Sequence, residues 1–172
     1  MGNKIVSKKN NRLKNKVIIM KEYKIIFVGD SGVGAKTSLL NRLDIDIFDL
    51  NCSSTSFDSP IKKSYKNKNG KIINLYLCDS AGQKLYKNMT EFLMKDSDCV
   101  VLGFDITNEE SFKNIQDYWY PKSKEISGAN LFYLVGNKID LALDRKVDEN
   151  IARKFAEENG MKYSSKSDFL PF

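Results

Sequence analysis

The chain has 172 residues, with 28 lysines and arginines, 22 aspartates and glutamates and no histidine, and its formal net charge is +6 at pH 7. This length supports a single domain with a sizeable hydrophobic core, and the lack of histidine excludes histidine-based acid–base catalysis and histidine zinc sites. No apolar run approaches the roughly 18 residues that a membrane-spanning helix needs, so a cytoplasmic protein is predicted.

The first 20 residues are strongly basic. They contain Lys4, Lys8, Lys9, Arg12, Lys14 and Lys16 and no acidic residue, while the rest of the chain carries no net charge. We expect residues 1–20 to be a disordered arm and residues 21–172 to form the folded domain, whose neutrality argues against nucleic-acid binding. The arm is suited to peripheral contact with anionic lipid, and Gly2 is a candidate for N-myristoylation. A compositional bias toward Asn and Lys is the alternative explanation.

A glycine-rich segment follows the first predicted strand. Residues 23–28 are apolar and β-prone, and residues 36–43 take up helical spacing. Between the two runs lie Gly29, Asp30, Ser31, Gly32, Val33, Gly34, Ala35, Lys36, Thr37 and Ser38. The order strand, glycine-rich turn, Lys-Thr and helix is typical of a loop whose backbone N–H groups enclose a polyphosphate. Lys36 would neutralise the outer phosphates, and the Thr37 hydroxyl would bind Mg²⁺.

The spacing of this phosphate loop is unusual, because Ala35 separates Gly34 from Lys36. Counted back from Lys36, Ala35 and Asp30 occupy the two positions that the motif assigns to glycine. Counted forward from Gly29, the lysine arrives one residue late. Either a Cβ lies where the backbone must approach phosphate oxygens or the turn holds an extra residue, and both should weaken binding. Taken alone, the loop is equally compatible with a turn that binds nothing.

A second motif ends another predicted strand. Residues 71–78 alternate like a half-buried strand, and Asp79-Ser80-Ala81-Gly82-Gln83 follows. An aspartate at the carboxyl end of a strand can hold Mg²⁺, the N–H of Gly82 can contact the terminal phosphate, and Gln83 can orient the attacking water. For an isolated motif of this kind, a strand-terminating Asp-Ser turn without a ligand is the alternative.

The third motif, Asn137-Lys138-Ile139-Asp140, follows the apolar run 131–136. The Asp140 carboxylate can accept hydrogens from both the ring nitrogen and the exocyclic amine of guanine. Adenine offers no such pair, so a buried carboxylate would stay unpaired at a cost of about 1–3 kcal/mol. Asn137 can bond the other edge of the base and tie neighbouring loops together, while the Lys138 stem can lie across the ring. The motif disfavours an ATP-dependent P-loop enzyme.

The hydrophobic pattern predicts an α/β fold. Strands are expected near 23–28, 61–66, 71–78, 98–104, 131–136 and 161–164, and helices near 36–43, 85–95, 109–126 and 148–159. This alternation indicates a mostly parallel six-stranded sheet with helices on both faces and ligands at the carboxyl ends of the strands. The sequence Trp119-Tyr120-Pro121 should break or kink the third helix and pack its aromatic rings. Cys78 and Cys99 should be reduced core thiols.

Taken together, the motifs resemble a small GTPase of the Ras superfamily, and within it the Rab branch, from about Tyr23 to Lys166. The segments that carry the resemblance are the phosphate loop, residues 79–83, residues 104–108 with 110–112, Asn137–Asp140, and Ser164-Ser165-Lys166, which is similar to the family's Ser-Ala-Lys. The resemblance implies a P-loop NTPase fold that binds GTP or GDP with Mg²⁺ and hydrolyses GTP slowly, with Gln83 and Lys36 as the catalytic groups. It implies that the backbone of residues 164–166 contacts the guanine oxygen, and that the protein acts in vesicle-mediated transport.

The same resemblance implies a switch-loop threonine that binds Mg²⁺. Counting forward from Leu43 reaches Thr55, whereas counting back from Asp79 reaches Ser56; we choose Thr55, which makes Thr37, Thr55 and Asp79 the expected Mg²⁺ ligands. Lys84 replaces the glutamate that usually follows the glutamine. The expected partners are exchange factors, GTPase-activating proteins and effectors. The expected state is a monomer in the cytoplasm, on the cytosolic face of Golgi or endosomal membranes.

The end of the chain departs from the family pattern. After Lys166 only residues 167–172 remain, so the final amphipathic helix is expected to be missing, and this tail contains no cysteine for prenylation. Such a chain is either truncated or a diverged member. The alternative function is a pseudo-GTPase, which keeps the fold as a protein-interaction module but has lost nucleotide binding.

Overall fold

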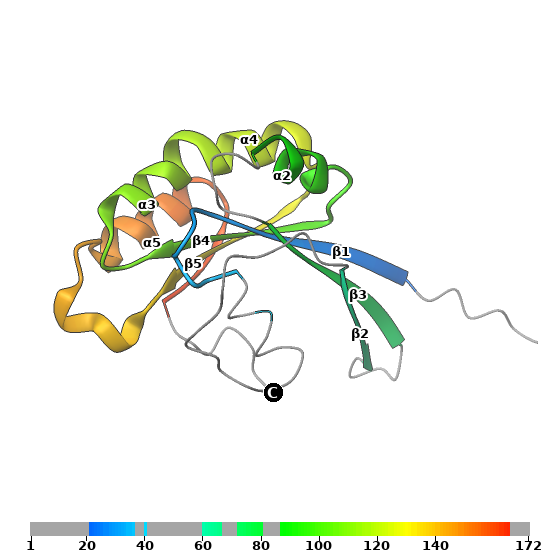
Figure 1. Ribbon diagram of the computed structural model, residues 1–172, viewed down its shortest axis with the longest axis horizontal. Helices are drawn as coiled ribbons and strands as arrows, with labels where there is room; N and C mark the ends of the chain where they lie inside the picture. The colour runs from blue at the N-terminus through cyan, green and yellow to red at the C-terminus, as the bar shows by residue number, and fades with distance from the viewer. Residues whose placement is uncertain (1–20, 37–39, 41–59, 67–71, 81–86, 166–172) are drawn as a thin grey trace, which may run out of the picture.

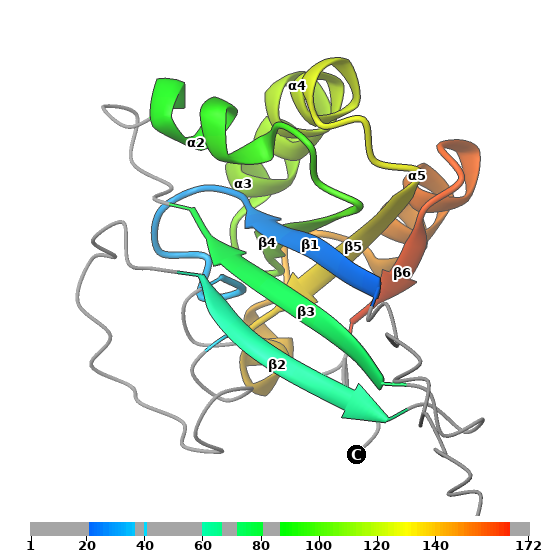
Figure 2. The same cartoon turned by 90° about the vertical axis from the view of Figure 1, so that its right-hand side faces the viewer.

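The computed structural model describes residues 21–36, 40, 60–66, 72–80 and 87–165. A twisted six-stranded sheet runs through the molecule in the order β2-β3-β1-β4-β5-β6 (Figures 1 and 2). Its strands are β1 (Lys21–Val28), β2 (Ile61–Lys66), β3 (Ile72–Asp79), β4 (Cys99–Asp105), β5 (Leu131–Asn137) and β6 (Lys162–Ser164). All six strands lie where the sequence predicts them, with boundaries that agree to within two residues.

Five of the strands are parallel, and only the edge strand β2 runs antiparallel to its neighbour β3. The register pairs Phe27 with Asp79 and Asp105 with Asn137. The carboxyl ends of β3, β1, β4 and β5 therefore meet at one edge of the sheet, as the α/β prediction requires. The motifs found in the sequence all follow strands that end at this edge.

The helices of residues 87–158 lie together on one face of the sheet (Figures 1 and 2). They are α2 (Lys87–Met94), α3 (Glu109–Asn114), the π-helical segment Ile115–Trp119, α4 (Tyr120–Ile126) and α5 (Glu149–Glu158), and a 3₁₀ helix (Ile139–Asp144) follows β5. Their apolar sides bury Met94, Phe112, Trp119 and Ala152 against Ile26 and Leu102. On the opposite face, Leu40 packs with Phe27, Val101 and Val135. Of the predicted helix 36–43, the structure describes only Lys36 and Leu40, and Leu40 packs on this second face of the sheet.

The helix predicted over 109–126 is continuous but changes its winding. Tyr120 N–H bonds the carbonyl of Ile115, five residues back, which marks a π-helical turn. Pro121, which has no N–H, is the second residue of the following α-helical segment, directly after this turn. The predicted break is therefore wrong, and the hydrogen-bond pattern changes locally instead. The packing role predicted for the aromatic residues is confirmed, because Trp119 is 1% and Tyr120 7% exposed.

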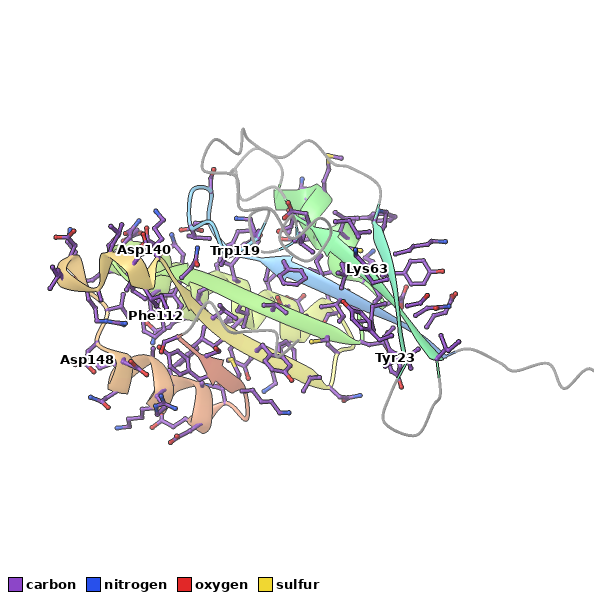
Figure 3. All side chains as sticks on the ribbon, turned by 90° about the horizontal axis from the view of Figure 1, so that it is seen from below. Tyr23, Lys63, Phe112, Trp119, Asp140 and Asp148 are labelled. Atoms are coloured by element: carbon purple, nitrogen blue, oxygen red, sulfur yellow. The ribbon has the colours of Figure 1, made fainter. Side chains whose placement is uncertain are left out.

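Helix α5 begins where the sequence indicates. The Asp148 carboxylate accepts hydrogen bonds from the backbone N–H groups of Asn150 (2.7 Å) and Ile151 (3.3 Å), and Figure 3 shows the residue at the start of the helix. The 3₁₀ helix after Asn137 was not predicted. It begins after Lys138, which has a left-handed backbone (φ 63°).

Both cysteines expected in the core are buried and free. Burial raises the pKa of the Cys99 thiol to about 12, with a further contribution from Asp98. The thiolate is the reactive form of cysteine, and this raised pKa favours the neutral thiol of Cys99 at neutral pH. Within the residues that the structure describes, none of the helices has the length and apolar character required to cross a membrane.

Candidate functional site

The phosphate loop leaves β1 through three glycines with positive φ. Gly29, Gly32 and Gly34 have φ of 146°, 79° and 72°, conformations that residues with a Cβ rarely adopt. A Cβ on Gly29 would lie 2.3 Å from the Gly103 carbonyl oxygen, and one on Gly34 would lie 2.7 Å from Asn137 Nδ2. The glycine positions therefore keep the register counted forward from Gly29, and Ala35 is the extra residue.

Ala35 does not point its side chain into open space. It is 2% exposed, and a Cβ added to Gly103 of β4 would lie 2.5 Å from the Ala35 Cβ. The methyl group of Ala35 thus occupies the space above β4 that a side chain at position 103 would otherwise fill. Of the two possibilities raised by the sequence, an extra residue in the turn is the one realised, and the sheet accommodates it.

Lys36 still reaches the loop despite the extra residue. Its side chain is buried, and its ammonium group donates a hydrogen bond to the backbone carbonyl of Asp30. Burial lowers the pKa of Lys36 to about 8, although the carboxylates of Asp79 and Asp30 oppose this shift. The backbone N–H of Leu40 donates a 3.0 Å hydrogen bond to the Lys36 carbonyl. A buried ammonium group beside a glycine-rich turn is suited to binding an anion.

Asp79 lies at the carboxyl end of β3, beside Lys36. Its Oδ1 atom is buried, and the next residue, Ser80, donates a 2.6 Å hydrogen bond to the Phe27 carbonyl of β1. This bond fixes the start of the second motif against the strand that leads into the phosphate loop. Asp79 is the one predicted Mg²⁺ ligand within the described residues. Six of the predicted site residues lie outside them, namely Thr37, Ser38, Thr55, Gly82, Gln83 and Lys166.

The third motif is tied directly to the phosphate loop. Asn137 Nδ2 donates a 2.9 Å hydrogen bond to the carbonyl of Val33, a residue 104 positions earlier in the chain. This contact confirms that Asn137 links neighbouring loops. Asp140 lies in the 3₁₀ helix and is exposed (Figure 3). The carboxylate predicted from the sequence to be buried is therefore exposed in the free protein, and only a bound base would cover it.

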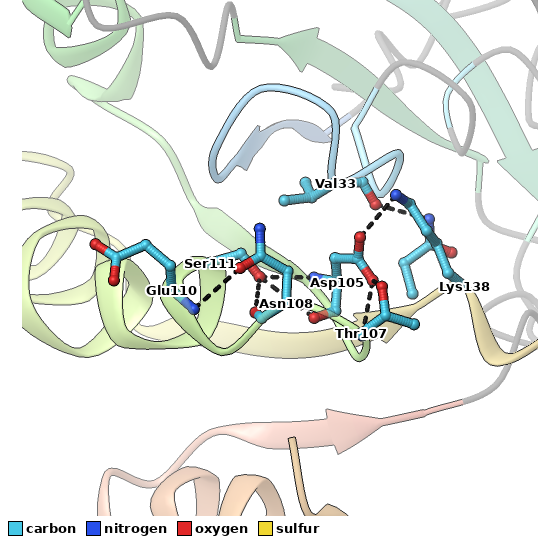
Figure 4. A network of polar contacts seen from close by, with 8 residues as sticks. Val33, Asp105, Thr107, Asn108, Glu110, Ser111 and Lys138 are labelled. Atoms are coloured by element: carbon cyan, nitrogen blue, oxygen red, sulfur yellow. Dashed lines mark hydrogen bonds and ion pairs between the residues drawn. The ribbon is translucent and has the colours of Figure 1, made fainter. Parts of the chain in front are cut away.

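Lys138 is held by an aspartate that sequence reasoning did not assign to the site. Its ammonium group lies 2.6 Å from Asp105 Oδ2, at the end of β4 (Figure 4). Asp105 Oδ1 also accepts hydrogen bonds from the backbone N–H (2.8 Å) and the hydroxyl (2.7 Å) of Thr107. Burial alone would raise the pKa of Asp105, but the bonds from Lys138 and Thr107 outweigh it and lower the pKa below its usual value. Asp105 directly follows a predicted strand, as Asp79 does, and this position in the sequence could have identified it as a candidate site residue.

The last predicted contact segment ends the edge strand β6. Ser164 pairs with Val135 of β5, two residues before Asn137, so it lies at the same edge of the sheet as the third motif. The Ser165 hydroxyl bonds Glu149 Oε1 of α5 at 3.1 Å. The side chain of Ser165 is thus engaged with the scaffold, which is consistent with a role for the segment through its backbone.

Comparison with known proteins identifies this arrangement. A family model described as the Ras family matches residues 24–168. The chain belongs to the Ras family of small GTPases. Ras-related protein Rab-1 of Theileria parva is 38% identical over 161 residues, which cover 87% of this chain and 70% of the relative. Rab-13 of Canis lupus familiaris is 38% identical over 143 residues and Rab-1D of Dictyostelium discoideum 34% over 142, each covering 82% of this chain and 68% of the relative. These relatives place this GTPase in the Rab branch.

Members of the Ras family bind guanine nucleotides, usually with Mg²⁺, and the residues of this small GTPase fit such ligands. A side chain at Gly34 would displace Asn137, so the loop keeps its glycine where the two motifs approach each other. Lys36 supplies a cation, and Asp79 supplies the hard oxygen ligand that Mg²⁺ prefers. Asn137 joins the third motif directly to the phosphate loop.

Proposed function

We propose that this small GTPase binds GDP and GTP with Mg²⁺ and works as a molecular switch that hydrolyses GTP slowly. The observation that carries the proposal is the hydrogen bond from Asn137 to the Val33 carbonyl. It joins a guanine-recognition motif to a phosphate loop in which Lys36 still caps the Asp30 carbonyl despite the extra residue. A chain in which Ala35 had disrupted the loop would not be expected to retain both contacts.

At the phosphate end, Lys36 balances negative charge on the outer phosphates. Thr37, Thr55 and Asp79 would hold Mg²⁺, which when bound supplies charge neutralisation at the β- and γ-phosphate oxygens. Gln83 orients the attacking water, and Thr55 couples the terminal phosphate to the order of the first switch loop. Strong acceleration would require an arginine from a GTPase-activating protein, since these residues position and neutralise charge rather than form a covalent intermediate.

At the base end, Asp140 selects guanine. The base covers a carboxylate that is exposed in the free protein, and guanine alone offers a pair of hydrogens to it. Lys138 is held at its amine by Asp105, which leaves its aliphatic stem to lie along the base. The backbone of Ser164, Ser165 and Lys166 would contact the guanine oxygen from the neighbouring strand end.

The proposed cellular role is in vesicle-mediated transport, because the relatives named above are Rab proteins. The partners would be exchange factors, GTPase-activating proteins and effectors that distinguish the two nucleotide states. The basic residues 1–20 would contribute peripheral contact with the cytosolic face of an endomembrane, Golgi or endosomal, through attraction to anionic lipid. The protein would act as a monomer.

The decisive test of the base assignment is Asp140→Ala. Without the carboxylate, the preference for GDP over ADP should fall by at least about tenfold, since a lost charged hydrogen bond costs about 1.5–3 kcal/mol. Asp144→Ala is the matched control, because Asp144 is an exposed aspartate of the same 3₁₀ helix. Competition binding with both nucleotides measures the ratio. An unchanged ratio in Asp140→Ala would refute the assignment.

One observation favours a second candidate, a pseudo-GTPase that serves as a protein-interaction module. Ala35 adds a residue to the loop, and burial lowers the pKa of Lys36, which weakens the cation available to phosphate at alkaline pH. The two functions differ in a simple observable. A GTPase purified in the presence of Mg²⁺ should carry GDP or GTP, which can be released by denaturation and identified by chromatography, whereas a pseudo-GTPase should carry neither.

A further inference from the structure

The second residue of the phosphate loop is tied to a helix far away in the chain. Asp30 Oδ1 accepts a hydrogen bond from the Trp119 indole Nε1 at 2.8 Å, and Asp30 Oδ2 accepts one from Asn114 Nδ2 at 2.6 Å. Figure 3 shows Trp119 beside the blue loop that follows β1. Both oxygens of one carboxylate are therefore held by neutral donors from the helix that begins with α3.

The π-helical segment brings these two donors together. Asn114 and Trp119 are five residues apart, and in an α-helix such residues point about 140° away from each other. In a π-helix the backbone hydrogen bonds join residues five apart, which stacks them on the same face. The bond from Tyr120 N–H to the Ile115 carbonyl shows that this segment is wound in that way. The change of winding thus serves the contact with Asp30.

The position of the carboxylate has an electrostatic consequence. Asp30 uses its backbone carbonyl to accept a hydrogen bond from Lys36 and its side chain to accept two from the helix. A carboxylate that turned toward Lys36 would compete with phosphate for the ammonium group and would repel the phosphates directly. The carboxylate of Asp79 raises the pKa of Lys36 more than the carboxylate of Asp30 does. This holds although Lys36 bonds the backbone carbonyl of Asp30, because the Asp30 side chain is bonded to the helix instead.

We propose that Trp119 and Asn114 are positioning residues that hold the Asp30 carboxylate against the helix, so that its charge does not compete with the phosphates of a bound nucleotide for Lys36. The inference deepens the proposed function and rests on it. It also gives a reason for the burial of Trp119, which is the single tryptophan of the chain and is 1% exposed. Because the Trp119 indole is buried, water does not compete with the Asp30 carboxylate for its N–H group.

The test compares GDP affinity in variants that remove either the donor or the charge. Trp119→Phe keeps an aromatic ring but removes the N–H, and GDP should bind about tenfold more weakly, the usual effect of losing a hydrogen bond to a charged group. Adding Asp30→Ala to Trp119→Phe should restore most of the affinity, because no carboxylate is left to turn. Tyr118→Phe is the matched control: it removes a hydroxyl from the neighbouring residue, whose partner is Glu91 of α2, 2.8 Å away.

Each outcome decides between the possibilities. If Trp119→Phe binds GDP like the wild type, the inference is wrong. If it binds weakly and Asp30→Ala does not restore binding, Trp119 acts only through packing and the inference is also wrong. Should Trp119→Phe fail to fold by circular dichroism, Asn114→Ala with and without Asp30→Ala repeats the comparison at the second donor. A folded wild type that binds no GDP overturns the proposed function together with this inference, whereas normal wild-type binding with unchanged variants overturns the inference alone.

Discussion

Ala35 and Gly103 form a complementary pair. The methyl group of Ala35 is buried over β4, and no side chain projects from position 103 to oppose it. A glycine inside a strand is normally unfavourable, because it packs nothing and has more backbone freedom to lose. Here it makes room for the extra residue of the phosphate loop. The extra residue Ala35 therefore fits because Gly103 of β4 has no side chain to occupy the same space.

This pairing predicts the stability of two variants. Gly103→Ala should lower the free energy of unfolding by about 1–3 kcal/mol, because the new Cβ would lie 2.5 Å from the Ala35 Cβ and one of them must shift. Deleting Ala35 in the Gly103→Ala background should recover much of this loss. Urea denaturation of the two single variants and the double variant measures the coupling. Strictly additive effects would show that the two residues do not compete for one space.

The lowered pKa of Lys36 leads to a prediction of how nucleotide binding depends on pH. In the free protein its pKa is lowered to about 8, whereas a bound polyphosphate would favour the charged form and raise it. Below pH 8 the lysine is already protonated; above pH 8 binding must first add a proton. The affinity for GDP should therefore fall by about tenfold per pH unit above pH 8.

Calorimetric titrations at pH 7 and pH 9 measure this dependence, and buffers of different ionisation enthalpy should reveal proton uptake at pH 9. Lys36→Arg is the control, because a guanidinium stays charged throughout this range. Its affinity is expected to be lower but independent of pH, apart from any titration of the nucleotide itself, which is common to both proteins. Equal slopes in the two proteins would assign the pH dependence to another group.

At the scale of elements, the helix cap of α5 is a separable contribution to stability. The Asp148 carboxylate satisfies two backbone N–H groups that have no partner within the helix. Asp148→Ala should therefore lower the free energy of unfolding by about 1 kcal/mol. Urea denaturation provides the measurement, with Asp144→Ala as the control for loss of an exposed aspartate. Equal effects of the two substitutions would contradict the capping assignment.

The elements themselves could be predicted because their signals are local. The strands show apolar alternation or short apolar runs, and the cap of α5 shows an aspartate at the helix start. Proline chemistry predicted a break at Trp119-Tyr120-Pro121, but the helix continues through a π-helical segment over Ile115–Trp119. The π-helical winding could not be predicted locally, because Trp119 bonds Asp30, which lies 89 residues away in the chain.

The site could be predicted only in part for the same reason. Its three motifs were found from sequence, and the bond of Asn137 to the phosphate loop bears out their association. The supporting residues were missed, because Gly103 and Asn114 carry no chemistry that identifies them before the chain folds. Asp105 was visible as a strand-terminating aspartate, yet its pairing with Lys138 depends on the alignment of β4 and β5.

At the scale of the whole molecule, the parallel sheet assembles the site. The carboxyl ends of four strands meet at one edge, and side-chain bonds connect the residues there, namely Ser80 to Phe27, Asn137 to Val33 and Lys138 to Asp105. Each bond joins parts of the chain that are distant in sequence. These bonds connect the third motif with the phosphate loop, as the proposed recognition of a whole nucleotide requires.

The central claim is that one pocket selects guanine through Asp140 while Lys36 binds the phosphates. Titration calorimetry of the folded wild-type chain with GDP, GTP and ATP in the presence of Mg²⁺ tests it most directly, after any co-purified nucleotide has been removed. The account predicts single-site binding of GDP and GTP and far weaker binding of ATP. Absence of heat with both guanine nucleotides, or equal affinity for ATP and GTP, would contradict it.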